Sequence, residues 1–264
     1  RSAVAAATGA LRQHARSLPL YDEMGQAWIG KGELDRARFV YEKASTITGA
    51  ENDAAIQAGF GWILLEKGER YTAEARLQRA LELDPGQPRA LLGLARLYAD
   101  DRNWTGSLPL LERAVALDPR NAGLQVELGR ALRGLGRLDE AEAAWRKALQ
   151  LDPKDPVPYF NLGVLFGDDR KQPAQGMTEL KAYLAAGGVE VALAQGYIDG
   201  FQKELERAAQ KKKQDEDKAR REAERKERER LLKEAESKPP APAPEAPQAP
   251  SPWGPAEQPQ GGGG

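Results

Sequence analysis

The sequence has no cysteine, a single histidine and no long apolar run, and each shortage removes a class of function. Without cysteine the chain forms no disulfide and offers no thiolate for chemistry. His14 lies ahead of the repeats described below, so neither a paired-histidine metal site nor a Ser-His-Asp arrangement is expected. No apolar run approaches the roughly 20 residues of a transmembrane helix. We therefore expect no enzyme, no catalytic residue, no metal or cofactor, and no membrane span.

The sequence also has few aromatic residues and no excess of positive or negative charge. Lysine and arginine number 39 against 40 acidic residues, so the formal net charge is -1 and favours neither nucleic acid nor an anionic membrane as a partner. Aromatic residues make up 6% of the chain, whereas 30% is charged and 41% hydrophobic. This balance suits a helical protein better than a β-sandwich or barrel. A chain of 264 residues has room for one or two domains.

What the sequence does contain is the tripeptide Leu-Asp-Pro at a fixed interval. Its prolines, Pro85, Pro119 and Pro153, are equally spaced along the chain. An alanine stands upstream of each proline at the same distance, and large side chains recur around it at helical spacing, which indicates one helical face. Since proline disfavours helix in the residue before it, Asp-Pro marks a helix end. Each unit is therefore predicted to be two short antiparallel helices.

This pattern resembles the tetratricopeptide repeat (TPR), whose period of about 34 residues equals the spacing of the three prolines. Earlier segments such as "EKGERYTAEARLQRA" and "GKGELDRARFVYEKA" fit the same template. The resemblance implies an all-α fold, a right-handed α-solenoid of about five helical hairpins over residues 18–187. One hairpin cannot bury its apolar face alone, but stacked neighbours share a core. We place the units at about 18–51, 54–87, 88–121, 122–155 and 156–187.

The match has departures. Gln57 and Gln125 stand where a bulky residue is usual, and the last unit carries one extra residue around "DDRKQPAQG". The adjacent carboxylates Asp168 and Asp169 fall there, where we expect a turn between two helices because Asp is common in turns. We interpret them as turn residues and not as metal ligands.

The sequence outside the repeats divides into four segments of different composition. Residues 1–17 are predicted to be an N-terminal helix or extension, and residues 188–205 a capping helix over the last hairpin, with an open partner-binding helix as the alternative. Residues 206–236 are almost all Lys, Arg, Glu and Ala, which predicts one charged, exposed helix. Residues 237–264 are rich in Pro and Gly, which predicts a disordered tail and favours a spacer over a ligand for an aromatic groove.

The charged helix lacks the apolar heptads of a coiled coil, so side-chain pairs must support it. Acidic and basic residues recur four apart, for example Glu216–Arg220 and Glu224–Arg228, and each such pair contributes about 0.2–0.5 kcal/mol. The run Lys211, Lys212 and Lys213 is closely followed by three acidic residues and has no interleaved aromatic residue. Nucleic-acid binding is therefore not expected.

In TPR proteins the first helix of each unit lines the concave surface. Mapped onto this chain, that face begins with Asp22 and Gln26 and carries four arginines between two apolar patches. A guanidinium binds carboxylates bidentately and stacks on aromatic rings, which indicates an acidic ligand with apolar anchors or a chain end. The alternative is that the arginines pair with neighbours such as Glu127. The predicted partner-binding groove comprises Trp62, Leu65, Arg89, Leu92, Arg96, Val126, Arg130, Arg133, Phe160 and Asn161.

Two functions of different classes follow from this organisation. The first is a non-catalytic scaffold or adaptor that binds a partner protein or peptide in the groove. The second is a structural spacer or self-assembly element that acts through the charged helix and the Pro-rich tail. The chain begins with Arg1 and not with Met, so we expect an N-terminal piece to have been removed. The composition and the resemblance favour a bacterial envelope or motility complex, of pilus or gliding type, with a periplasmic or envelope location favoured over a cytoplasmic one.

Overall fold

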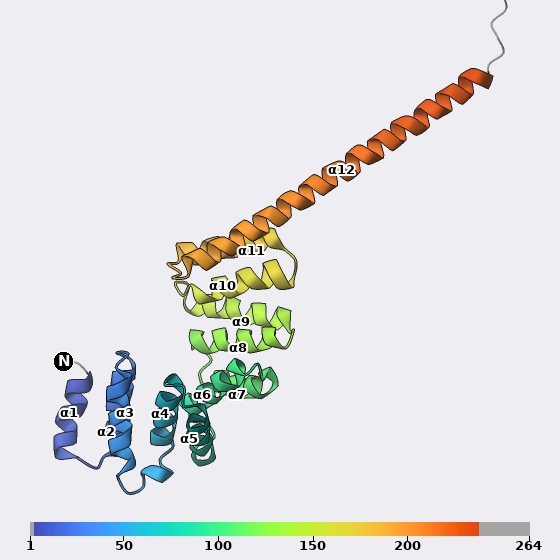
Figure 1. Cartoon of the computed structure of the whole chain (residues 1–264). Helices are drawn as coiled ribbons and strands as arrows, with labels where there is room; N and C mark the ends of the chain where they lie inside the picture. The colour runs from blue at the N-terminus through green and yellow to red at the C-terminus, as the bar shows by residue number, and fades with distance from the viewer. Residues whose placement is uncertain (1–2, 238–264) are drawn as a thin grey trace, which may run out of the picture. The chain divides into compact units, whose positions relative to one another are not determined.

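The computed structural model describes residues 3–237, and that part of the chain is helical with no strand (Figure 1). This confirms the predicted all-α fold; the predicted disordered tail at residues 237–264 falls, apart from Ser237, outside the described residues. The helices are α1 (Ala3–Gln13), α2 (Leu18–Ile29), α3 (Leu34–Ser45), α4 (Ala54–Glu66), α5 (Arg70–Leu83), α6 (Pro88–Asp100), α7 (Trp104–Leu117), α8 (Ala122–Gly134), α9 (Leu138–Leu151), α10 (Val157–Val164), α11 (Pro173–Ala185) and α12 (Val191–Ser237).

Helices α2 to α11 pair into five hairpins, and each hairpin packs on the next. The first helices of neighbouring hairpins contact one another, so α2 packs on α4 and α4 packs on α6. Figure 1 shows the hairpins following one another in chain order. The result is an α-solenoid, as the constant interval of the Leu-Asp-Pro tripeptides predicts; the limits of the individual units stay a prediction.

The turn inside each hairpin uses one residue in the left-handed region. Gly32, Gly68 and Gly136 take φ values of 72°, 78° and 75° in hairpins one, two and four. Arg102 and Lys171 occupy the same place in hairpins three and five, each with φ of 56°. Glycine adopts this conformation without steric cost, whereas a side chain does not. Three hairpin turns therefore meet this requirement with glycine. The turns at Arg102 and Lys171 place a residue with a side chain there and are strained.

Close packing between hairpins depends on glycine facing a large side chain. Tyr41 is fully buried on α3, and a Cβ added at Gly25 or Gly59 would lie 2.5 or 2.3 Å from its ring. Trp145 on α9 lies over Gly129 in the same way, where a Cβ would meet the ring at 2.4 Å, and its Nε1 donates to the Val126 carbonyl at 3.0 Å. Glycine is required here because the ring occupies the space of a side chain.

The fifth hairpin departs from the others at its extra residue. Asp168 and Asp169 were predicted to form a turn, but they lie in a π-helical turn, η2 (Leu165–Asp169), that continues α10. A π-turn absorbs one inserted residue without ending the helix. The prediction of a turn at these two aspartates was wrong, because the insertion widens the helix by one residue and moves the turn to residues 170–172.

Helix α12 contains the boundary between two compact units, which falls between Arg207 and Ala208. Within the first unit, Ala194, Ile198 and Phe201 of α12 are buried with Leu180 and Tyr183 of α11. This is the contact that a capping helix makes. The capping and charged segments, predicted as separate elements, belong to one continuous helix.

In the second unit, the described side chains of residues 208–237 are exposed, with Asp217 half-buried. Ion pairs occur along this segment, as predicted, but between other partners than the expected ones. Examples are Arg225 with Glu229 at 3.2 Å and Arg230 with Glu227 at 2.8 Å. Long exposed side chains have several oppositely charged neighbours three or four residues away, so the particular pair is not fixed by the sequence.

Candidate binding groove

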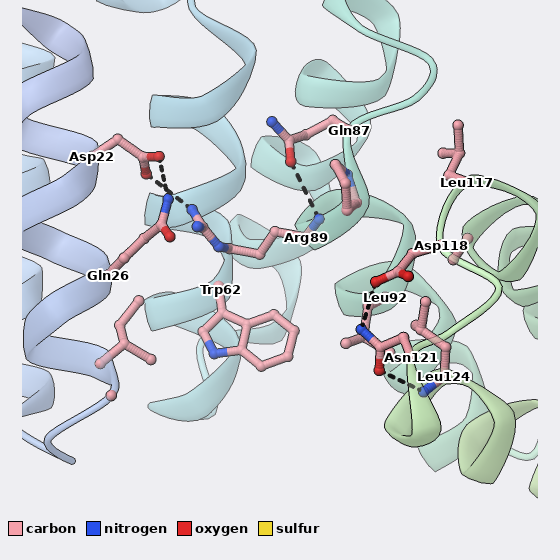
Figure 2. A pocket seen from close by; sticks show the side chains of 14 residues that line it. Asp22, Gln26, Trp62, Gln87, Arg89, Leu92, Leu117, Asp118, Asn121 and Leu124 are labelled. Carbon is pink, nitrogen blue, oxygen red and sulfur yellow. Dashed lines mark hydrogen bonds and ion pairs between the residues drawn. The ribbon is translucent and has the colours of Figure 1, made fainter. Parts of the chain in front are cut away.

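A hollow of about 680 Å³ lies among the first helices of the solenoid, and we name it the Trp62 hollow (Figure 2). Its walls come from α2, α4 and α6, together with the end of α7 and the start of α8. Its larger apolar side chains are Ile29, Trp62, Leu92, Leu117 and Leu124. Its polar side chains are Asp22, Gln26, Gln87, Arg89, Asp118 and Asn121.

Two lining residues of the hollow, Asp22 and Arg89, form a polar cluster with the buried Tyr41. The Asp22 Oδ1 atom accepts hydrogen bonds from the Tyr41 hydroxyl at 2.8 Å and from Arg89 Nη1 at 3.0 Å. Arg89 also donates to the Tyr41 oxygen at 3.4 Å. The Arg89 and Asp22 side chains are only 19% and 13% exposed. Burial raises the pKa of the Tyr41 hydroxyl far above its ordinary value, so this group stays protonated and donates to Asp22.

A second arginine, Arg96, contacts the Trp62 side chain that lines the hollow. The Arg96 guanidinium lies 5.2 Å from the centroid of the Trp62 ring and pairs with Glu66 at 3.3 Å. This cation–π contact orients the Trp62 indole, which is one of the apolar side chains that line the hollow. Arg96 is therefore engaged both with the Trp62 ring and with a carboxylate.

The other two predicted arginines lie in a second hollow of about 400 Å³, the Asn161 hollow. Arg130 pairs with Glu127 at 2.8 Å, and Arg133 contacts both oxygens of Asp169. The Nδ2 atom of Asn161 is buried and has no hydrogen-bond partner among the described residues. All four predicted arginines thus have a carboxylate partner, which is the alternative that the sequence left open.

The remaining predicted residues divide between the groove and the core. Leu92 lines the Trp62 hollow, and Leu65 is half-buried on α4. Val126 is 6% exposed and packs in the core, so its side chain does not face a ligand. The Phe160 ring packs edge-on against Tyr183 at 5.3 Å and Tyr197 at 5.9 Å, and so serves the contact with α11 and α12.

Sequence reasoning missed the groove residues that come from second helices and connecting loops. Leu117, Asp118 and Asn121 line the Trp62 hollow, although the TPR resemblance pointed to first helices alone. Leu117 is the leucine of a Leu-Asp-Pro tripeptide, a position that the sequence marks, and the structure leaves it 56% exposed. A leucine repeated at a helix end but left outside the core is available for binding.

The Trp62 hollow combines apolar side chains with a few polar and charged groups, as ligand-binding clefts commonly do. Among residues 3–237, no three His, Asp or Glu side chains gather as a metal site requires. In the same part of the chain, no helix combines the length and the apolar character needed to cross a membrane.

Comparison with known proteins gives partial matches to several relatives. The chain is 33% identical over 126 residues to "Protein CTR9 homolog" of Arabidopsis thaliana, covering 47% of this chain and 11% of that protein. It is 30% identical over 156 residues to "Type IV pilus assembly protein PilF" of Pseudomonas aeruginosa, covering 58% of this chain and 61% of that protein. The chain thus spans less than two thirds of the length of these relatives.

Solved structures share the fold. The crystal structure of the APC/C hetero-tetramer Cut9-Hcn1 matches with a TM-score of 0.66 and 19% identity, over 74% of this chain and 38% of that one. The structure titled "YrrB: a TPR protein with an unusual peptide-binding site" matches with a TM-score of 0.55 and 21% identity, over 72% and 96%.

Sequence profiles of two repeat families match the solenoid directly. The profile described as "Tetratricopeptide repeat" matches residues 59–122, and the profile described as "TPR repeat" matches residues 129–169. Both segments lie in the helical hairpins of the described structure, and the matching solved structures have the same fold. The chain therefore contains tetratricopeptide repeats, which the two profiles match over residues 59–122 and 129–169.

Proposed function

We propose that this protein is a non-catalytic scaffold that binds a segment of a partner protein in the Trp62 hollow. The observation that carries the proposal is the hollow itself, with its large apolar residues and the stacked indole of Trp62. Apolar side chains that the chain's own core leaves uncovered, such as Leu117, gain most from a ligand that removes them from water. A peptide side chain on Trp62 and Leu92 therefore supplies the main anchor.

The pairing of the arginines refines the ligand that the sequence suggested. Arg89 and Arg96 already have carboxylate partners, so an acidic group on the ligand must compete with Asp22 or Glu66 for them. Desolvating a charge that then lacks a partner is costly. The apolar anchor therefore precedes the acidic group in importance, and acidic residues add affinity where they displace an existing pair.

Known proteins support this assignment in general terms. One structural neighbour is titled a TPR protein with a peptide-binding site, and one relative is named a pilus assembly protein. We extend this to the proposal that the partner belongs to a bacterial envelope or motility complex, and that the protein works in the envelope.

The test begins with short random peptides displayed with free C-termini and selected on the full-length protein. The selected peptides are then synthesised and titrated against Trp62→Ala. We expect selected peptides to carry a large apolar residue and to lose at least tenfold in affinity with this variant, as for a central aromatic anchor. The matched control is Tyr71→Ala, because Tyr71 is 92% exposed on α5 and outside the hollow. Equal affinity for both variants would remove the hollow as the binding site.

A second candidate is the structural spacer, in which residues 208–237 carry the function. The observation in its favour is that these residues form helix without a core, with exposed charges along their length. At 1.5 Å per residue this segment is roughly 45 Å long. If selected peptides or partners bind residues 208–237 and tolerate Trp62→Ala, the spacer replaces the scaffold as the account of function.

A further inference from the structure

The contact between Asp22 and Arg89 differs from the other ion pairs of the solenoid in what it joins. Hairpins one and three are separated by hairpin two, and α4 packs between α2 and α6. Asp22 lies on α2 and Arg89 on α6, so their 3.0 Å contact passes across α4. The other ion pairs found in residues 3–237 join neighbouring hairpins, as Arg96 and Glu66 do, or lie within a single hairpin or helix. Within that part of the chain, this pair alone skips a hairpin.

The Asp22–Arg89 pair is also less exposed to water than the Arg96–Glu66 pair, which joins adjacent hairpins. The Asp22 and Arg89 side chains are 13% and 19% exposed, whereas Arg96 and Glu66 are 41% and 36% exposed. An ion pair that is largely removed from water is screened little by salt and restricts geometry more than a surface pair. The second carboxylate oxygen of Asp22 accepts from Gln26, so both oxygens are bonded.

Tyr41, the third member of the cluster, contacts both Asp22 and Arg89. The Tyr41 ring lies close to Gly25 and Gly59, where an added Cβ would stand 2.5 and 2.3 Å from it, and it is fully buried. Its hydroxyl donates to Asp22 at 2.8 Å and lies 3.4 Å from Arg89. Because Tyr41 belongs to the core of hairpins one and two, it places Asp22 where Arg89 of hairpin three meets it. Packing of Tyr41 thus positions its hydroxyl beside both charged groups.

From these contacts we infer that Asp22 and Arg89 form a clasp across α4 that sets the spacing of hairpins one and three and thereby the shape of the Trp62 hollow. Both residues line that hollow, and the Trp62 ring on α4 lies beside the pair (Figure 2). Small rotations between repeats change the curvature of a solenoid. A contact that spans two such junctions restrains both rotations at once. The coupling to ligand rests on the proposed function, whereas the restraint itself does not.

The restraint is tested by distance measurements on the full-length chain. The sequence has no cysteine, so Glu23→Cys and Glu112→Cys place two spin labels, one on hairpin one and one on hairpin three. Both positions are exposed. Pulsed electron paramagnetic resonance then gives the distribution of distances between the two spin labels. We expect Asp22→Asn and Arg89→Gln each to widen that distribution, and the double variant to widen it no further than either alone.

Non-additivity separates a clasp from two unrelated losses of stability, because two residues that act through one contact cannot lose it twice. A control pair, Glu66→Gln with Arg96→Gln, removes a contact between adjacent hairpins and should leave the distribution nearly unchanged. An unchanged distribution in Asp22→Asn, or widening that adds up in the double variant, would overturn the clasp. Circular dichroism confirms that each variant is folded.

Coupling to the hollow is measured with a peptide selected as described above. We expect Asp22→Asn to weaken its binding several-fold, because the competent shape of the hollow becomes a smaller fraction of the ensemble. Binding that is unchanged while the distances widen would overturn the coupling but keep the clasp. Failure to select any peptide would count against the proposed function, and the distance measurement would still decide the clasp.

Discussion

The solenoid and residues 208–237 form helices for different physical reasons. In the solenoid, a large side chain such as Trp145 is fully buried against a neighbouring helix, so helix formation is stabilised by packing. In residues 208–237 the described side chains lie in water, and the helix depends on propensity and on ion pairs between exposed groups. The comparison teaches that identical secondary structure can have opposite sensitivities to mutation and to salt.

Removing one core side chain should show most strongly that packing stabilises the solenoid but not residues 208–237. We expect Trp145→Ala to lower the free energy of unfolding of the solenoid by about 3–5 kcal/mol, because it empties the space over Gly129 and removes a buried hydrogen bond. Urea unfolding followed by circular dichroism measures the loss. Leu231→Ala, at a residue 54% exposed in the charged segment, is the control and should change it by less than about 0.5 kcal/mol. Equal effects would contradict the contrast.

The same substitution should have opposite signs at two glycines. Gly59→Ala places a methyl group 2.3 Å from the Tyr41 ring, and we expect a loss of about 1–3 kcal/mol. Gly200→Ala on α12 meets nothing within 4 Å, and we expect a gain of up to about 1 kcal/mol from helix propensity. Thermal unfolding of both variants measures the two signs. A gain at Gly59 would show that the ring moves aside.

Relief of strain in a hairpin turn should give a smaller gain. Arg102 has a φ of 56° where three other hairpins have glycine. Arg102→Gly removes the left-handed cost at the expense of backbone entropy, so we expect a net gain of about 0.5–1 kcal/mol. Arg102→Ala keeps the strain and serves as the control, with little change in the unfolding midpoint. A gain of the same size in both variants would assign the effect to the arginine side chain.

Salt should have the smallest effect of the four changes. It should alter amide hydrogen exchange in residues 208–237 and not in the solenoid. Raising the salt from about 10 mM to about 1 M shortens the screening length from roughly 30 Å to roughly 3 Å. We expect amide hydrogen exchange to accelerate in residues 208–237, where exposed pairs such as Arg225 with Glu229 support the helix. Buried amides of α6 and α8 should keep their rates. Acceleration confined to the solenoid would reverse the assignment.

The fold could be predicted from the sequence because its signals are local and repeated. Leu-Asp-Pro marks helix ends at a constant interval, and a repeat of that length has few structural interpretations. The π-turn at Asp168 and Asp169 was not predicted, because an inserted residue can lengthen a turn or widen a helix. The local sequence does not distinguish these outcomes.

The site was predictable only in part, because it depends on how the hairpins curve. First-helix residues such as Trp62 and Leu92 were predicted from their repeat position, and they line the Trp62 hollow. Leu117 and Asn121 were not, because they reach the hollow from the end of α7 and the loop that follows it. The pairing of Arg89 with Asp22 joins residues 67 positions apart, and no sequence spacing indicates such a contact.

The central claim is that partner binding occurs in the Trp62 hollow, and hydrogen exchange of the full-length protein with and without a selected peptide tests it most directly. We predict slower exchange in α4 and α6, around Trp62 and Leu92, with unchanged exchange in residues 208–237. Protection that appears in residues 208–237 and is absent from α4 and α6 would contradict the account and assign binding to the charged helix.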